Sequence, residues 1–534
     1  MRQPTLHSTL YTLHLNAALI IILLTSPLVL WLLCQLLPTF DDWTYYTVPY
    51  MGKLFSSRLL PIDSWWRPFD HVFGWIVGLN YRLFPTLNHV FVYAAHLVST
   101  LLLWRIAGQL SFSRFGQTIA VLIFYLSPAM LGTVTGIDSL NQAYSHLWGL
   151  VAMTIYLKDE GLRMKDEGLR IYLKDEGLRI KDEGLRMKDE SNNPSSLISH
   201  PSSSINPSSL IPHPSSLFAI IIATLCKENG YMWAIIIPFV AWAFQLIDSR
   251  RLRRHWIIAI ALAVVYFIVR LLLTTNQVDI NQEYLHVTLS DRLRDIATFL
   301  GLTWVPIDYV ALFNLISHLS PLTSHLLIGL SAVLGLPFML YVYFGNPRNL
   351  FNRRHLVLFA SIILAALPHL ITLFTTMHAY AGLSMAALSM AWLSERLKRR
   401  KTVVLLFSLY LVNVIAVDLH HGVAAWQSGQ IGKRMGVEAI RKTGQPVDTV
   451  SIIYINTGER RYSSFCCIPY EAFAWGNTAL YETGYQWPND FQYHEIAGGP
   501  DEHQQALALA RKDIDLGNCQ CAWIVRKDQI EVVR

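Results

Sequence analysis

Two adjacent carboxylates, Asp41 and Asp42, follow the first long apolar block of the chain, in the segment PTFDDWTYY. No basic residue stands beside them in the sequence. Adjacent carboxylates near a membrane surface can take a proton from a hydroxyl group or hold a divalent cation. The structural alternative is an acidic pair that flanks a membrane span in a solvated loop. On these residues alone both interpretations stay open.

Two basic residues next to apolar blocks, Arg67 and Lys227, are candidates for binding a phosphate, and Glu228 is a candidate to line the same site. Arg67 follows two tryptophans in SWWRPF, and an arginine beside interfacial tryptophans can meet a lipid phosphate. Lys227 and Glu228 interrupt an apolar block at LCKENGYMW. A lysine there can stabilise charge on a phosphate, whereas the alternative is a mutually neutralising Lys–Glu pair buried near the membrane. We weigh these two alternatives equally.

Four other polar residues in or between apolar blocks are candidates to line the same site: His96, Asp138, His378 and Tyr380. A histidine within a span is more often a hydrogen-bonded packing residue than a catalyst, and His378 and Tyr380 carry the same alternative. Asp138 can help to bind an acceptor or simply end a loop, and we favour the loop.

The spans lack zinc-type ligand spacing, and the chain has no glycine-rich phosphate loop, so ATP-driven transport is not expected. No cofactor is required by these residues, and the role of a divalent cation stays open.

Membrane-spanning helices must position these residues. Of the 534 residues, 53% are hydrophobic and 15% are charged, and the apolar residues gather in long blocks. Most blocks are close to the roughly 20 residues that cross a bilayer as a helix. One block is too long for a single span and should split near Lys227 into a short helix and a full one, which gives about eleven spans. The blocks cover residues 17–37, 88–108, 117–134, 139–157, 217–247, 256–274, 322–344, 355–374, 379–396 and 402–418.

The net charge of +6 comes from short basic clusters between the apolar blocks, which is how membrane orientation is encoded. No nucleic-acid partner is implied. If the spans alternate, the clusters fall on one side, which we expect to be the cytoplasm, together with an uncleaved N-terminus. The segment 38–87 and the chain beyond 419 then face the other side. The clusters are Arg105 with Arg114, residues 250–254, Arg348 with Arg353 and Arg354, and residues 396–401.

Composition divides the chain into four parts: a first membrane part at 1–157 that includes the first extracytoplasmic loop, an insert at 158–216, a second membrane part at 217–419 and a small α/β domain at 420–534. The insert repeats IYLKDEGLR units and continues into a Ser/Pro-rich tract, so we expect it to form no core. A charged spacer or partner-binding arm is the functional alternative.

The last part has soluble composition. We expect a strand at 448–455, a helix in HQQALALARKDID and a terminal hairpin in CAWIVRKDQIEVV. Upstream, the amphipathic run SDRLRDIATFLGLTWVP, within 275–321, can lie at the membrane interface or re-enter the membrane.

Four of the six cysteines, Cys466, Cys467, Cys519 and Cys521, fall in this last part. An oxidising compartment makes disulfides the default, and adjacent or near-adjacent cysteines bridge each other only with strain. We therefore expect the Cys466–Cys467 pair to be linked to the Cys519–Cys521 pair. A four-thiolate zinc site is the alternative, but its usual CxxC spacing is absent.

The order of these motifs resembles the GT-C superfamily of glycosyltransferases, specifically the polyprenyl- or dolichyl-phosphate-sugar users similar to the transmembrane tetratricopeptide-repeat O-mannosyltransferases and their bacterial relatives. That family has an acidic pair after the first span, an Arg-Pro-hydrophobic turn, a span with a histidine, and a Lys-Glu signature before a Pro-ended span, as in LCKENGYMWAIIIP. The resemblance covers most of 17–247. TTMHAYAGL stands where relatives usually carry an Arg-Tyr pair, and no tetratricopeptide array is present.

The resemblance implies a helical polytopic fold in a bacterial plasma membrane and an inverting transfer of one sugar from a polyprenyl-phosphate carrier to an acceptor hydroxyl of a protein, glycan or lipid. One of Asp41 and Asp42 would act as the general base, while Arg67 and Lys227 would stabilise the leaving phosphate. The rival classes are a secondary transporter or lipid flippase, which predicts internal pseudo-symmetry, and an inactive membrane scaffold.

Overall fold

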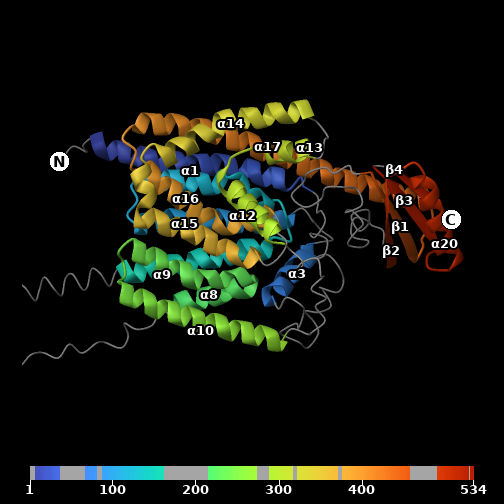
Figure 1. Ribbon diagram of the computed structural model, residues 1–534, viewed down its shortest axis with the longest axis horizontal. Coiled ribbons are helices and arrows are strands. Elements are labelled where there is room, and N and C mark those ends of the chain that lie inside the picture. The colour runs from blue at the N-terminus through green and yellow to red at the C-terminus, as the bar shows by residue number, and fades with distance from the viewer. Residues whose placement is uncertain are drawn as a thin grey trace, which may run out of the picture.

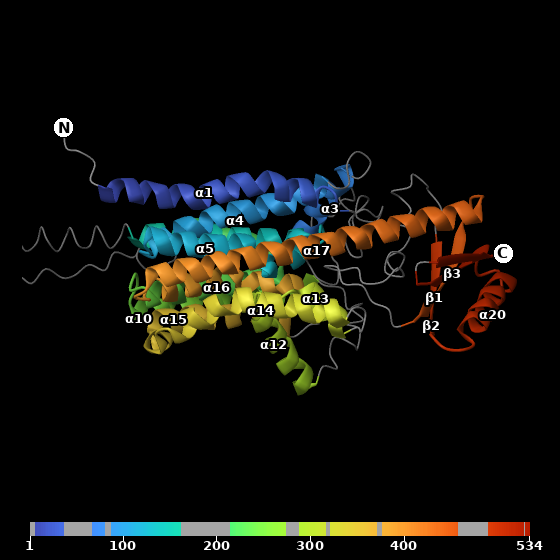
Figure 2. The ribbon, with the colours of Figure 1, turned by 90° about the horizontal axis from the view of Figure 1, so that it is seen from above.

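The computed structural model describes residues 6–36, 67–80, 87–161, 214–273, 288–316, 321–370, 376–457, 490–527 and 529–534. Within these ranges the chain forms a bundle of helices and, beyond one end of it, a small domain built on a sheet. A single long helix, α17 (Arg400–Thr443), runs from the bundle to that domain (Figure 1, Figure 2). Asp41, Asp42, Cys466 and Cys467 lie outside the described residues.

Most helices of the bundle overlap the apolar blocks of the sequence, whereas α3, α12 and α13 lie outside them. The predicted split of the block at 217–247 is confirmed, because α8 and α9 are separated by the 3-10 turn η5. The helices are α1 (Leu6–Leu33), α3 (Pro68–Asn80), α4 (Asn88–Gln109), α5 (Arg114–Leu126), α6 (Leu131–Val134), an unlabelled helix from 140 to at least 161, α8 (Pro214–Cys226), α9 (Trp233–Ala243), α10 (Ser249–Leu273), α12 (Leu289–Trp304), α13 (Tyr309–Ile316), α14 (Pro321–Phe344), α15 (Arg353–Ala366) and α16 (Tyr380–Ser394).

In the part of the chain that the structure describes, short 3-10 turns interrupt the bundle at five places: η3 (Pro128–Met130), η5 (Glu228–Met232), η6 (Pro347–Phe351), η7 (Leu367–Leu370) and η8 (Thr376–Ala379). Among the described residues, four helices are long and apolar enough to cross a membrane: Asn88–Gln109, Ser249–Leu272, Leu322–Phe344 and Arg400–Gln427. A fifth span is added if α5 and the η3–α6 segment, bent by 46°, count as one. The protein is therefore a multi-span membrane protein. The total of about eleven spans stays a prediction, because several apolar blocks form shorter or broken helices.

The centre of the bundle is α16, all of whose residues are buried. Its sequence, YAGLSMAALSMAWLS, is rich in Ala, Ser and Gly, and small side chains let neighbouring helices approach closely where lipid offers no hydrophobic drive. α16 packs against α5 and α15. The periphery is different: only 11% of the apolar window of α10 is buried, so most of this helix faces lipid.

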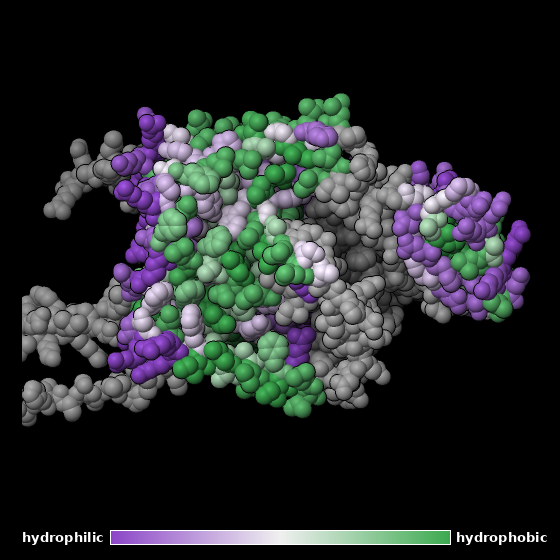
Figure 3. Space-filling model, in the orientation of Figure 1, coloured by the Kyte–Doolittle hydropathy of each residue, from purple (hydrophilic) through white to green (hydrophobic). Residues whose placement is uncertain are grey.

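The hydrophilic surface of the bundle gathers at the end where α10, α15 and α17 begin, while an apolar belt covers its middle (Figure 3). This end carries the arginine clusters of the sequence, and we call it the arginine-rich end. The gathering of the arginine clusters at one end agrees with spans that alternate in direction. Which side of the membrane this end faces is not fixed by the structure.

The small domain is a four-stranded mixed sheet of order β2-β1-β3-β4. β1 (Thr449–Asn456) pairs in parallel with β2 (Asp490–Ala497) and β3 (Cys521–Arg526), and β3 forms an antiparallel hairpin with β4 (Gln529–Val533). The helix α20 (Glu502–Asp515) covers one face, and the last turns of α17 cover the other. The predicted strand, helix and terminal hairpin are therefore confirmed, and α17 continues unbroken through the boundary drawn at 419.

Cys519 and Cys521 are buried in this domain as free thiols. Burial raises the pKa of both, to about 11 for Cys521. Because Cys466 and Cys467 are not described, the disulfide pairing stays a prediction.

Candidate functional site

The candidate site is built at the break between α8 and α9. After Cys226 the backbone extends at Lys227, with φ −155° and ψ 142°, and then tightens into η5. Gly230 makes this turn possible, because a Cβ atom there would lie 2.3 Å from the backbone carbonyl of Ala223 in the last turn of α8. The motif Lys-Glu-Asn-Gly thus places three polar side chains inside an apolar bundle.

Arg67 reaches this break from a distant part of the chain. It directly precedes α3, which opens with Pro68 and packs against α8. Its Nε atom donates to Glu228 Oε2 at 2.7 Å, and its Nη2 atom donates to Glu228 Oε1 at 2.6 Å. Both side chains are largely buried, with 17% and 16% of their surfaces exposed. A bidentate pair of this kind fixes the plane of the guanidinium as well as its position.

Lys227 is almost fully buried, with 2% of its surface exposed. Its Nζ atom lies 3.8 Å from the sulfur of Met377 in η8. The hydroxyl of Ser139 lies 3.6 Å from the same sulfur and donates to Asp138 Oδ1 at 3.2 Å. Met377 therefore joins the lysine to the loop that carries Asp138. The predicted candidates Arg67, Lys227, Glu228 and Asp138 fall in one neighbourhood.

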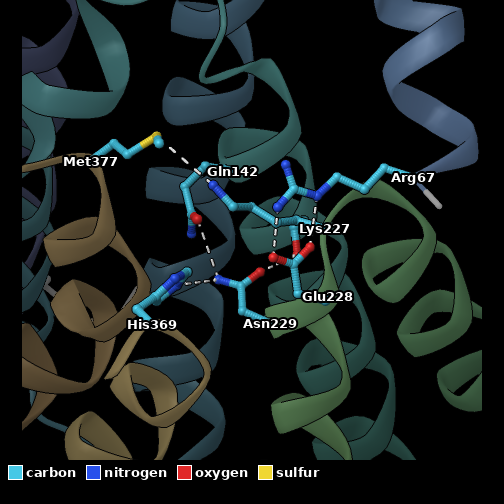
Figure 4. A network of polar contacts seen from close by, with 8 residues as sticks. Arg67, Gln142, Lys227, Glu228, Asn229, His369 and Met377 are labelled. Atoms are coloured by element: carbon cyan, nitrogen blue, oxygen red, sulfur yellow. Dashed lines mark hydrogen bonds and ion pairs between the residues drawn. The ribbon is translucent and has the colours of Figure 1, made fainter. Parts of the chain in front are cut away.

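Asn229 connects the break to two further elements (Figure 4). Its Nδ2 atom lies 3.3 Å from Gln142 Oε1 and 3.2 Å from His369 Nε2, and its Oδ1 atom accepts from the Ser145 hydroxyl at 3.2 Å. Since the amide nitrogen is a donor, His369 Nε2 is the acceptor and its proton resides on Nδ1. The network ties η5, the 140–161 helix and η7 together and so fixes the position of Glu228.

His378 is joined to this network through a second histidine. Its ring stacks on that of His369 with centroids 3.9 Å apart, and both rings are buried. A chain of contacts through His369 and Asn229 thus connects His378 to the break that carries Glu228.

His96 and Tyr380 instead contact each other. The Tyr380 hydroxyl lies 3.0 Å from His96 Nδ1, and the other ring nitrogen lies 3.2 Å from the Tyr125 carbonyl oxygen. The rings of Phe124 and His146 pack around them. This arrangement matches the alternative in which His96 is a hydrogen-bonded packing residue, and Tyr380 has the same role in the bundle core.

Several site residues were missed by the sequence analysis: Gln142, Asn229, His369 and Met377. The first three carried a usable signal, since a polar side chain inside an apolar block is costly unless it has a partner. Met377 carried none, because methionine is an ordinary core residue.

The described site gathers three cationic side chains, Arg67, Lys227 and Arg270 of α10, around one carboxylate, Glu228. Such a cluster can bind an anionic group and stabilise charge that develops on it. Within the described residues, no group of three or more His, Cys, Asp or Glu side chains could hold a metal ion.

Comparison with described protein families and with curated proteins finds no match. Among solved structures, ArnT from Cupriavidus metallidurans in the apo state aligns with 97% of this chain and 98% of its own, at 10% identity and a TM-score of 0.44. The same protein bound to undecaprenyl phosphate gives a TM-score of 0.41 at 10% identity, with 96% and 97% covered. The archaeal oligosaccharyltransferase AglB from Archaeoglobus fulgidus, in complex with an inhibitory peptide and a dolichol-phosphate, aligns at 13% identity and a TM-score of 0.39, over 78% of this chain and 58% of its own. At TM-scores below 0.5, these similarities alone establish neither a shared fold nor a shared activity.

Proposed function

We propose that this protein is a membrane glycosyltransferase with a GT-C-like fold, and that it moves a sugar from a polyprenyl-phosphate carrier to an acceptor hydroxyl. The observation that carries the proposal is the Arg67–Glu228 ion pair with Lys227 beside it. Two separate sequence motifs, 160 residues apart, each supply a cation to the same place in the bundle.

The chemistry of the cluster supports a phosphate ligand. When a sugar leaves its carrier, negative charge develops on the carrier phosphate, and preorganised cations lower the barrier most where water is excluded. Glu228 orients the Arg67 guanidinium, and burial within the bundle keeps Lys227 in place. Position within a membrane bundle further favours a lipid-linked donor over a soluble nucleotide sugar.

Asp41 and Asp42 complete the proposal as the source of the general base. One of them would take the proton of the acceptor hydroxyl while that oxygen attacks the anomeric carbon from the face opposite the phosphate. In the sequence they lie between α1 and Arg67, in the segment that leads to the cation cluster. We propose that this side of the protein faces away from the cytoplasm and that about eleven spans surround it.

The test is a transfer assay on the purified protein in nanodiscs. A panel of radiolabelled undecaprenyl-phosphate sugars is supplied, and release of the sugar from the lipid is followed. We expect release from at least one donor. Arg67→Ala or Lys227→Met should slow it by about 100- to 1000-fold, the usual effect of losing one charge-stabilising donor. Arg348→Ala, at the arginine-rich end, is the matched control and should leave the rate unchanged.

The same donors, supplied to the protein in sealed vesicles, separate the rival classes. A flippase or transporter would move intact donor across vesicle membranes without cleaving the sugar–phosphate bond, and an inactive scaffold would do neither. Intact donor throughout the panel, with the folded state of the protein verified, would rule out the glycosyltransferase.

A further inference from the structure

Two separate hollows lie along α9, between α10 and α15. α9 packs against both of these helices and lies between them in Figure 1. The first hollow is an apolar groove of about 410 Å³. Its walls include Phe239 of α9, Trp256 and Ile260 of α10, and Ala360 and Ile363 of α15. Ile260 is 59% exposed and Ile363 37% exposed, so the groove opens toward lipid.

The second hollow, of about 410 Å³, lies at the arginine-rich end and has a partly polar lining that includes Trp242, Asp248, Arg251 and Arg353. The Arg353 guanidinium lies 4.7 Å from the centroid of the Trp242 ring, and its Nη2 atom donates to the Ala243 carbonyl at 3.2 Å. Arg251 is held by Glu160, with Nη1 and Oε2 3.4 Å apart. Both arginines are thus held in place at the mouth of the hollow.

Aromatic rings join the two hollows. The rings of Phe239 and Trp242 stack with centroids 6.0 Å apart, and Trp256 meets Phe239 edge-on at 5.3 Å. Phe239 and Trp256 line the groove, while Trp242 lines the polar hollow. A ligand with a charged head and an apolar chain could therefore occupy both at once.

The charge around the polar hollow selects an anion. The segment DSRRLRR at 248–254 contains four arginines and one aspartate, and NPRNLFNRR at 346–354 contains three arginines and no acidic residue. Arginine is well suited to a phosphate, since its planar fork donates two parallel hydrogen bonds. Basic pockets between spanning helices are a known way to hold anionic lipid head groups.

We propose that this paired hollow binds one anionic glycerophospholipid from the leaflet at the arginine-rich end, with its phosphate against Arg353 and Arg251 and an acyl chain in the groove. The site is separate from the Arg67–Glu228 cluster. From Glu228 to Trp242 the chain advances by about 20 Å at 1.5 Å per helical residue. The inference therefore does not depend on the proposed transfer reaction.

The experiment counts retained lipids. Protein is delipidated in detergent, reconstituted in nanodiscs of phosphatidylcholine with 20 mol% phosphatidylglycerol (about one lipid in five) and released for native mass spectrometry. We expect one phosphatidylglycerol to be retained in preference to phosphatidylcholine. Arg353→Ala should weaken its retention about five-fold, the effect of one cation at a charged membrane surface. Ala360→Trp, which fills the groove, should weaken retention of the same lipid.

Arg348→Ala removes a charge from the same end, but Arg348 does not line the hollow, and this variant should retain phosphatidylglycerol normally. All variants are first checked for a monodisperse elution profile. If Arg353→Ala is not folded, Arg353→Gln serves in its place, and the same loss is expected because the cation is removed.

Three results would overturn the proposal. Equal retention of both phospholipids would remove the selectivity for an anion. Equal losses in the Arg353 and Arg348 variants would indicate diffuse electrostatics and no defined site. Displacement of phosphatidylglycerol by trace undecaprenyl phosphate would assign the hollow to the carrier lipid.

Discussion

At the residue scale, the contacts that matter connect side chains from different spans. The sequence predicted Arg67, Lys227 and Glu228 because charged residues beside apolar blocks are exceptional. It left open whether Lys227 and Glu228 neutralise each other. The structure gives Glu228 a bidentate bond to Arg67 instead, and puts Lys227 against Met377. Such pairings depend on how spans pack, which local patterning does not encode.

The first prediction concerns the carboxylate pair. Asp41→Asn and Asp42→Asn should each leave expression and membrane insertion intact. At least one of them should abolish sugar transfer, because an amide cannot take the proton from the acceptor hydroxyl. We expect the larger loss for Asp42, which the aromatic Trp43 follows, although adjacent carboxylates can titrate as a coupled pair. Transfer rates on purified protein are the measurement. Full activity in both variants would show that the base lies elsewhere.

At the element scale, breaks in helices do more than spans to place the site. Long apolar blocks located most helices of the bundle, because lipid imposes a strong and simple pattern. It could not reveal that η5, η7 and η8 converge, since each is only a few residues long. The reason for one break is local and visible: Gly230 allows η5 to lie against the backbone of α8.

Gly230→Ala should therefore lower both stability and transfer. The added Cβ would lie 2.3 Å from the Ala223 backbone, so α8 and η5 must separate, at a cost of about 2 kcal/mol. Displacement of Glu228 by even about 1 Å could slow transfer about 100-fold. Thermal unfolding in detergent and the transfer assay measure the two effects. Gly329→Ala in α14 is the control, because nothing lies within 4 Å of its added Cβ, and it should change neither quantity.

The insert, in contrast to Gly230, should be removable without loss of topology or transfer. The helix that precedes it runs to Gly161 and keeps Glu160 buried against Arg251, and α8 begins at Pro214. Replacing 162–213 by about eight Gly/Ser residues, which reach about 15 Å, should preserve topology and transfer. A deletion that starts at 158 removes Glu160 and should lower the thermal midpoint. A correctly inserted but inactive 162–213 deletion would show that the insert is an interaction arm.

At the scale of the whole molecule, α17 fixes the relation between membrane part and sheet domain. Its first turns lie in the bundle, and Met435, Ala439 and Ile440 near its end pack on the sheet. Composition changes near 419 and suggested a boundary there, but a polar sequence can continue a helix out of the membrane. The strands and α20 were predictable from alternation and periodicity. The continuity of α17 was not, because helix ends are marked by capping signals and not by hydropathy.

The last prediction tests the side of the membrane on which the sheet domain lies. If the domain faces an oxidising compartment, the Cys466–Cys467 pair should be joined to the Cys519–Cys521 pair. Closing this loop of about 50 residues should stabilise the domain by roughly 3 to 4 kcal/mol. Peptide mapping without reductant should then recover cross-linked peptides that contain both pairs.

Alkylation for this mapping must be done in denaturant. Burial raises the pKa of Cys521 to about 11 and also raises that of Cys519. At pH 8 only about one Cys521 thiol in a thousand would be ionised in the folded domain, so a protected free thiol would resemble a disulfide under native conditions. If all four cysteines are alkylated after unfolding, the disulfides are absent. The orientation that puts the arginine-rich end in the cytoplasm then loses its support from the cysteines.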